Sequence, residues 1–238
     1  MPSYLILFLI AGIFAECVGT IAGFGASTIL VPLTSLFIPI KETIVLVGVF
    51  HMFGTLARTV AFRGGINWRI ALLFGVPSLI FSIIGAYFLS YISGEALQKI
   101  LGVALIVYAI NSLLKNGIKL PKKDWVLVFG GTTVGFLAGL IGTAGALRGA
   151  FLTAQKLKKE VYLGTGAIVG VGADVARVIV YKNTGLINYS SQTMVLLLVT
   201  AVFGTIIGSF VVSRFKEGVF MKFVMVALLI AGVRILLP

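Results

Sequence analysis

A largely apolar run over residues 4–39, broken by Gly23 and Gly25, constrains this chain more than any other feature. The run is too long for one membrane crossing and too short for two crossings joined by a loop. The two glycines let the backbone turn without a Cβ clash, and the small residues 26–28 then begin a second helical segment. A helix that begins inside a membrane has N–H groups without partners, and an anion suits them because the helix dipole also favours negative charge. The alternative is a kinked helix whose glycines only allow close packing.

The same pattern of glycines and small residues recurs over residues 139–145, inside another overlong apolar run. At an offset of 116 the following pairs match: Gly19 with Gly135, Ala22 with Ala138, and Gly23 with Gly139. The recurrence favours a functional site over a packing element.

Composition places the chain among membrane proteins. Hydrophobic residues make up 59%, charged residues 11%, and the mean hydropathy is +1.14, which together indicate a polytopic helical protein. The net charge of +12 sits in short loops, so no nucleic-acid partner is expected. One cysteine, Cys17, excludes a disulfide framework and a cysteine-based metal site, and we expect no cofactor. The first lysine is Lys41, so we expect no cleavable signal peptide.

The chain divides into two similar halves at a polar connector over residues 115–123. We predict one repeat over 1–117 and a second over 118–238, within a single membrane domain. Between 83–114 and 206–237, at an offset of 123, ten of 32 positions are identical. The predicted apolar segments are 4–22, 26–39, 43–62, 69–91, 96–114, 125–140, 143–155, 161–181, 191–213 and 219–237. Charged positions also match between the halves, namely Lys99 with Lys222 and Arg58 with Arg177.

The basic residues of the loops indicate the topology. Four crossings in each half would divide these 16 residues 8 to 8, whereas a hairpin at each glycine break divides them 12 to 4. The positive-inside rule favours the uneven division. We therefore predict an all-α polytopic membrane protein of two inverted repeats, each a glycine-broken re-entrant hairpin plus three transmembrane helices. The connector around Lys119 is predicted to be cytoplasmic, with Met1 and Pro238 outside; a single crossing by each broken segment is the alternative.

The glycine signature at 23–25 with Pro32 behind it, together with the run over 139–152, resembles the TauE/SafE family of sulfite-exporter-like permeases. The resemblance covers essentially the whole chain. It implies secondary transport of small anions across the cell membrane, sulfur-containing ones such as sulfite, sulfoacetate or related sulfonates. The chain departs from the family pattern at Ala144, where glycine is common, and at Gly149, where proline is common, and both departures concern the choice of substrate.

Charged side chains inside a bilayer cost about 2.5–3.5 kcal/mol each on insertion scales, so each needs a reason. Arg58 and Arg177 lie near the ends of their predicted segments, where they could snorkel to the interface or contact an anion. Arg148 follows the second glycine site by three to six residues, close enough for its guanidinium to hold an oxyanion. The predicted substrate-binding residues are Gly23, Gly25, Ala26, Ser27, Thr28, Arg58, Gly142, Thr143, Ala144, Gly145, Arg148 and Arg177.

Three further ionisable residues are candidates for coupling transport to protons. Asp174 lies one turn before Arg177 and could simply neutralise it. Glu16 has no cation near it in sequence, so it is either a proton-coupling carboxylate or an interfacial residue. His51, the single histidine, is either a packed and hydrogen-bonded side chain or a proton carrier.

Two functions fit these patterns. One is a secondary anion transporter, which holds its substrate near the membrane midplane between two half-helix N-termini. The other is a passive anion channel, which could use the same helix ends without a coupling carboxylate. An enzyme is disfavoured because no nucleophile–base pair or metal-ligand cluster is visible. The expected partners are a small anion and the lipid bilayer, with a homodimer as one candidate assembly.

Overall fold

The structure is a computed structural model, and it describes residues 4–114, 120–211 and 217–237, with side chains from 224 onward in the last range. These residues form helices and no strand. In chain order the helices are α1 (Tyr4–Ala22), α2 (Ser27–Thr34), α3 (Ile40–Ala61), α4 (Trp68–Leu89), α5 (Gly94–Leu113), α6 (Asp124–Ile141), α7 (Gly145–Thr153), α8 (Lys159–Asn183), α9 (Ser191–Val211) and α10 (Glu217–Leu236). The predicted all-α membrane fold is confirmed.

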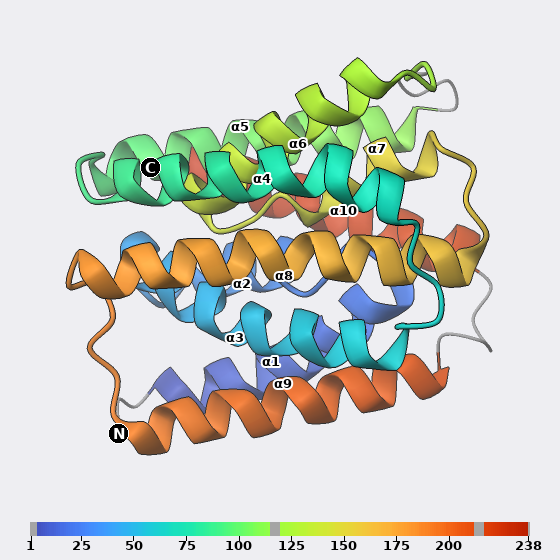
Figure 1. Cartoon of the computed structure of the whole chain (residues 1–238). Helices are drawn as coiled ribbons and strands as arrows, with labels where there is room; N and C mark the ends of the chain where they lie inside the picture. The colour runs from blue at the N-terminus through green and yellow to red at the C-terminus, as the bar shows by residue number, and fades with distance from the viewer. Residues whose placement is uncertain (1–3, 115–119, 212–216, 238) are drawn as a thin grey trace.

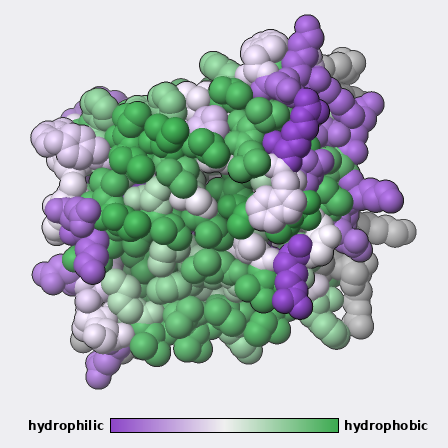
Figure 2. All heavy atoms as spheres, in the orientation of Figure 1, coloured by the Kyte–Doolittle hydropathy of each residue, from purple (hydrophilic) through white to green (hydrophobic). Residues whose placement is uncertain are grey.

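Seven of the described helices are long and apolar enough to cross a membrane: α1, α3, α4, α5, α6, α8 and α9. In the described part of α10, residues Val224–Leu236 form a shorter apolar stretch. Figure 2 shows apolar side chains over the middle of the molecule and hydrophilic ones gathered at its two ends. That distribution is typical of a protein whose middle faces lipid.

The two broken segments are built as hairpins with unequal arms. Helix α2 has eight residues and α7 has nine, which corresponds to about 12–14 Å at the usual rise, well short of the roughly 30 Å hydrocarbon core. Figure 1 shows α2 turning back beside α1, and α7 returning towards the end of the bundle where α6 begins. The structure therefore favours the predicted hairpins over single crossings by each broken segment.

Helices from the two halves interleave across the bundle. Helix α4 packs against α6 and α8, while α9 packs against α1 and α3, and α3 also packs against α8. Figure 1 places the start of α1 and the end of α10 at the same end of the bundle. This is the arrangement that two inverted repeats would give, and the inverted symmetry stays a prediction. The predicted cytoplasmic position of Lys119, and those of Met1 and Pro238, lie outside the described residues.

The positions of the helix ends give a different offset between the two glycine breaks from the offset of 116 that the sequence match gave. Helix α1 ends at Ala22 and α6 at Ile141, which are 119 residues apart (141 minus 22), and α3 and α8 begin 119 residues apart (159 minus 40). Gly23 therefore corresponds to Gly142, and not to Gly139 as the offset of 116 predicted. The match at 116 was misleading because glycine and alanine recur about every turn in α6, so a shift of three residues still pairs small residues.

Candidate functional site

The two glycine breaks meet inside the molecule. Gly23, Gly25 and Gly142 have φ angles of +78°, +87° and +75°, in the left-handed region that side chains with a Cβ rarely adopt. Gly145 begins α7 against the first break, because a Cβ there would lie 1.9 Å from the carbonyl oxygen of Phe24. The two glycine breaks therefore lie against each other in the structure.

The N-terminus of α7 is capped by a side chain of the other hairpin. The backbone N–H of Ala146 donates to the Thr28 hydroxyl at 3.2 Å, and the Thr143 hydroxyl lies 3.4 Å from the same oxygen. The N-cap residues of both short helices, Ala26 of α2 and Ala144 of α7, make no side-chain hydrogen bond of their own, so the contact from Thr28 is the side-chain cap of α7. Thr28 and Thr143 therefore join the two breaks, in addition to the anion contact that the sequence suggested for them.

Arg177 caps the C-terminal end of α6 by hydrogen bonds. Its Nη1 atom donates to the carbonyl oxygens of Ala138 and Gly142 at 2.8 and 2.9 Å. Its Nη2 atom pairs with Asp174 at 2.8 Å, and the side chain is 1% exposed, so snorkelling is wrong for this arginine. Helix α8 continues to Asn183, which places Arg177 deeper than the sequence suggested. The guanidinium compensates carbonyls that the hairpin leaves without helical partners.

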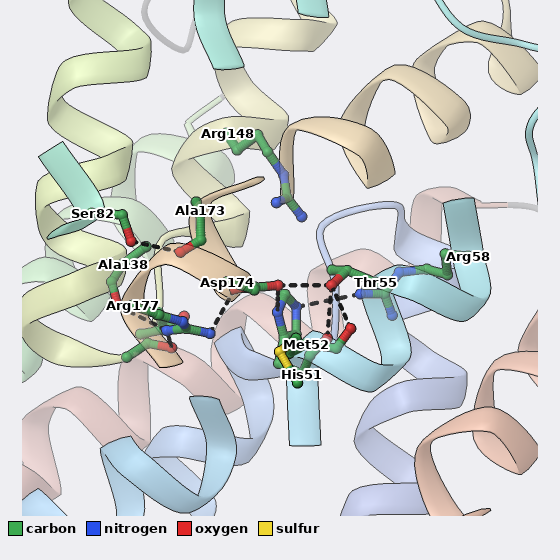
Figure 3. A network of polar contacts seen from close by, with 12 residues as sticks. His51, Met52, Thr55, Arg58, Ser82, Ala138, Arg148, Ala173, Asp174 and Arg177 are labelled. Atoms are coloured by element: carbon green, nitrogen blue, oxygen red, sulfur yellow. Dashed lines mark hydrogen bonds and ion pairs between the residues drawn. The ribbon is translucent and has the colours of Figure 1, made fainter. Parts of the chain in front are cut away.

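Asp174 collects three donors at one carboxylate. Besides the Arg177 pair, its Oδ2 atom accepts from the Thr55 hydroxyl at 2.8 Å and lies 2.8 Å from Nδ1 of His51. Figure 3 shows this group between α3 and α8. Asp174 is paired with Arg177, which agrees with one of the two interpretations of this residue from the sequence, and His51 is packed and hydrogen-bonded, which agrees with one of its two.

A second buried ion pair lies on the other side of His51. Arg58 pairs with Glu16, whose Oε1 atom also accepts from the Thr205 hydroxyl at 2.9 Å. Glu16 is fully buried and Arg58 is 4% exposed, so an interfacial position is wrong for both. The Nη2 atom of Arg58 lies 3.4 Å from Nε2 of His51. Arg58 belongs to this pair and does not reach the cavity described below.

Arg148 has the fewest partners of the buried arginines. It lies in the first turn of α7, is 6% exposed, and donates from Nη2 to the carbonyl oxygen of Phe24 at 3.2 Å. Its Nε atom has no hydrogen-bond partner, and within the described residues no ion pair joins it to a carboxylate. Figure 3 shows its guanidinium pointing towards the Asp174 group, with no dashed line reaching it.

A small cavity lies where these elements meet. Its volume is about 20 Å³, room for about one water molecule. It is lined by Ser27, His51, Ser78, Val134, Ala138, Gly142, Ala144, Gly145, Arg148, Ala173, Asp174 and Arg177. Eight of these twelve were predicted from the sequence, while the first-break glycines, Ala26, Thr28, Thr143, Arg58 and Glu16 support the cavity from outside or lie away from it.

Sequence reasoning missed four residues that line the cavity from α4, α6 and α8: Ser78, Val134, Ala138 and Ala173. They are small or apolar residues within long apolar helices, and no local signal separates the last three from neighbours that face lipid. A weak signal existed at Ser78, which lies one turn before the equally buried Ser82 on α4. Among the described residues no group of three His, Cys, Asp or Glu side chains could hold a metal ion.

The comparison with protein families decides the relationship of the chain. The model of the family described as Sulfite exporter TauE/SafE matches residues 8–235. The chain belongs to the TauE/SafE family. Comparison with curated proteins and with solved structures found no match.

As a TauE/SafE protein the chain is a membrane transport protein of the sulfite- and anion-exporter type. Its two departures from the family pattern lie at the second hairpin. Ala144 lines the cavity, whereas Gly149 lies one turn into α7, where a Cβ would be 3.0 Å from the Tyr162 hydroxyl. Only the first of these positions touches the candidate site.

Proposed function

We propose that this TauE/SafE protein is a secondary transporter that binds a small anion at the cavity between its two glycine breaks. The substrate class that fits the family is sulfur-containing: sulfite, sulfoacetate or a related sulfonate or organic acid. The anion is exchanged by alternating access, with proton coupling through the buried carboxylates and His51. A passive anion channel that uses the same cavity is the second candidate.

Charge balance in the interior carries this proposal. The buried charged side chains of the described residues are three arginines and two carboxylates, with His51 as the one buried titratable base. The carboxylates are committed, because Glu16 pairs with Arg58 and Asp174 with Arg177. Arg148 is left as a buried cation without a counter-charge, which is unfavourable in a low-dielectric interior. A bound anion would supply that charge at the cavity that Arg148 lines.

The small size of the cavity supports a binding site that opens by movement of the surrounding helices. A space for about one water cannot admit a multi-atom anion, so the surrounding helices must separate before a substrate binds. An open channel would keep a continuous path through the protein. The small volume of the cavity therefore supports alternating access.

The two ends of the bundle also differ, as they would in one state of an alternating cycle. At one end the α3–α4 loop is sealed onto α8, where the N–H of Asn67 donates to the Thr165 hydroxyl at 2.9 Å. Thr165 corresponds to Leu46 at an offset of 119 (165 minus 119), and Asn67 corresponds to Asn188 of the α8–α9 loop, at the other end, at an offset of 121 (188 minus 67). There Leu46 and Asn188 line a cavity of about 410 Å³ instead of forming a seal. This difference supports a state closed at the Asn67 end.

Substitution of Arg148 tests the site. We expect the affinity for sulfite, measured by thermal stabilisation of the purified protein, to fall from wild type to Arg148→Lys and again to Arg148→Ala. Lysine keeps the charge but loses the planar donor fork, and one charge-assisted hydrogen bond contributes roughly 1.5–3 kcal/mol, which is about tenfold or more in affinity. Equal affinity in three equally folded proteins would remove Arg148 from the site. Sulfoacetate, thiosulfate, sulfate and small carboxylates in the same assay would define the substrate.

Flux measurements in proteoliposomes separate the transporter from the channel. A secondary transporter should respond to an imposed proton gradient, and Glu16→Gln and His51→Ala should weaken that response. Flux that ignores the gradient and survives both substitutions would favour the channel.

We further propose that the protein lies in the cytoplasmic membrane with the Asn67 end inside. The uneven division of basic residues, 12 against 4, supports this orientation. Lys122 and Asn183 are exposed at opposite ends of the bundle and can be replaced by cysteine in a Cys17→Ser background. An impermeant thiol reagent added from outside should label position 183 and spare position 122; the reverse pattern would invert the orientation. A homodimer stays an expectation from the sequence.

A further inference from the structure

Ser78 lies in the wall of the cavity that the second hairpin also lines. It belongs to α4, is fully buried, and lines the cavity together with Arg148 and Arg177. Its position is set by close helix packing, because a Cβ at Gly135 of α6 would lie 2.1 Å from the Ser78 carbonyl oxygen. The small residue lets the two backbones approach, as small residues do between membrane helices.

The hydroxyl of Ser78 has no hydrogen-bond partner. Ser82, one turn later on the same helix and equally buried, donates to the carbonyl oxygen of Ala173 at 2.7 Å. Buried hydroxyls are usually satisfied in this way, often by a carbonyl of the preceding turn. Thr20 also has an unpartnered hydroxyl, but it does not line the cavity. Ser78 is thus the buried, unsatisfied hydroxyl at the site.

Two unsatisfied cationic donors line the same cavity. The Nε atoms of Arg148 on α7 and of Arg177 on α8 are buried and without partners. Together with the Ser78 hydroxyl they provide hydrogen-bond donors from three helices. An acceptor with more than one oxygen could satisfy donors from several sides, which a single-atom anion does less well.

We propose that Ser78 is a direct ligand of the transported anion and donates its hydroxyl to one oxygen while Arg148 binds another. This inference rests on the proposed anion site and adds a specificity determinant to it. The ligand class is a small oxyanion that presents separate oxygens to α4 and to α7. Ser78 then favours oxyanions over halides, because a halide offers no second atom to bridge the helices.

The test compares Ser78 and Ser82 in the full-length protein. The probe is sulfite, with chloride as competitor, and affinity is measured by thermal stabilisation of the purified protein. We expect Ser78→Ala to weaken sulfite binding about tenfold, since one hydrogen bond to a charged group is lost, and to leave any stabilisation by chloride unchanged. Ser82→Ala should lower the melting temperature but keep the affinity for sulfite. If Ser78→Ala does not fold, Ser78→Cys replaces it in the test, because cysteine keeps a small side chain but is only a weak hydrogen-bond donor. Ser78→Cys should then show the same loss of sulfite affinity.

The outcomes separate this inference from the proposed function. If Arg148→Ala loses sulfite binding while Ser78→Ala and Ser78→Cys keep it, the anion site stands and the role of Ser78 is overturned. If Ser82→Ala loses as much affinity as Ser78→Ala, the effect is one of helix packing and the role is again overturned. If wild type binds no oxyanion, both the site and the role of Ser78 fail.

Discussion

The two hairpins satisfy the carbonyl groups at the end of their first helix in different ways. At the first break the end of α1 is closed by the backbone, because the Gly19 carbonyl oxygen accepts from the N–H groups of Gly23 and Gly25 at 2.9 and 3.0 Å. At the second break the end of α6 is closed by side chains of α8. Arg177 donates to two of its carbonyls, and the Tyr181 hydroxyl donates to the Gly139 carbonyl at 2.6 Å.

The difference explains how two arginines at matching positions come to have different surroundings. The first break needs no side chain to cap it, so Arg58 is available to pair with Glu16 and to approach His51. At an offset of 119 the position of Tyr181 corresponds to Phe62, which carries no hydroxyl (181 minus 119). Matching positions in the two halves therefore need not have matching roles. Arg177 is a structural cap that also lines the cavity, and Arg58 belongs to an ion pair away from it.

Loss of the α6 cap should have the largest effect on stability. Arg177→Ala leaves Asp174 without its arginine partner and two buried carbonyl oxygens without their hydrogen-bond donor. Breaking a buried ion pair typically costs about 3–5 kcal/mol. We expect little monodisperse protein after detergent extraction and a large fall in melting temperature. Arg69→Ala is the matched control, because the Arg69–Asp124 pair is largely exposed and contributes at most about 1 kcal/mol. If the two variants were equally stable, the capping role of Arg177 would be wrong.

Removal of the negative charge from the Glu16–Arg58 pair should have a smaller effect on stability. Glu16→Gln keeps an acceptor for the Thr205 hydroxyl and for Arg58 but loses the negative charge, and a hydrogen bond to a charged group contributes about 1.5–3 kcal/mol. The melting temperature of Glu16→Gln should therefore lie between those of wild type and Arg177→Ala. A fall as large as that of Arg177→Ala would mean that both arginines are structural to the same degree.

Substitutions of the glycines at the two breaks should have the next largest effect on stability. Gly142→Ala should cost about 1–2 kcal/mol, the usual penalty for a Cβ at a left-handed residue. Gly25→Ala should cost more, because its Cβ would also lie 2.4 Å from Nε2 of His51. Valine at either position should in addition abolish stabilisation by sulfite while the protein stays folded. Melting temperatures with and without sulfite measure both effects, and unchanged binding in both valine variants would reduce these glycines to packing elements.

The smallest effect should come from the second half of the α6 cap. Tyr181→Phe removes one buried hydrogen bond to the Gly139 carbonyl, which corresponds to about 1 kcal/mol. Tyr91→Phe is a suitable control, since Tyr91 is exposed and donates only to Tyr87. We expect a modest fall in melting temperature for the first variant and none for the second. Equal melting temperatures would leave Arg177 as the sole cap of α6.

The sequence by itself determined the fold class and the elements of the site. Hydropathy and length predicted α1 over residues 4–22, as observed, because a membrane helix must satisfy its backbone within its own apolar segment. The glycine pairs predicted where the helices break, because glycine adopts the left-handed angles found at Gly23, Gly25 and Gly142 far more readily than residues with a Cβ. Arg148 and Asp174 were predictable as special residues since charge inside a membrane is unfavourable without a partner.

The tertiary structure alone decided which partners these residues have. Asp174 and His51 are 123 positions apart in sequence, and Glu16 and Arg58 are 42 apart, so no local pattern could assign either contact. The inclusion of Ser78 in the cavity follows from how α4 and α6 approach each other through small residues, whereas Arg58 is held away from the cavity by its pair with Glu16. A sequence records which groups are costly to bury, whereas the packing of distant helices determines which of them are satisfied and which remain free for a ligand.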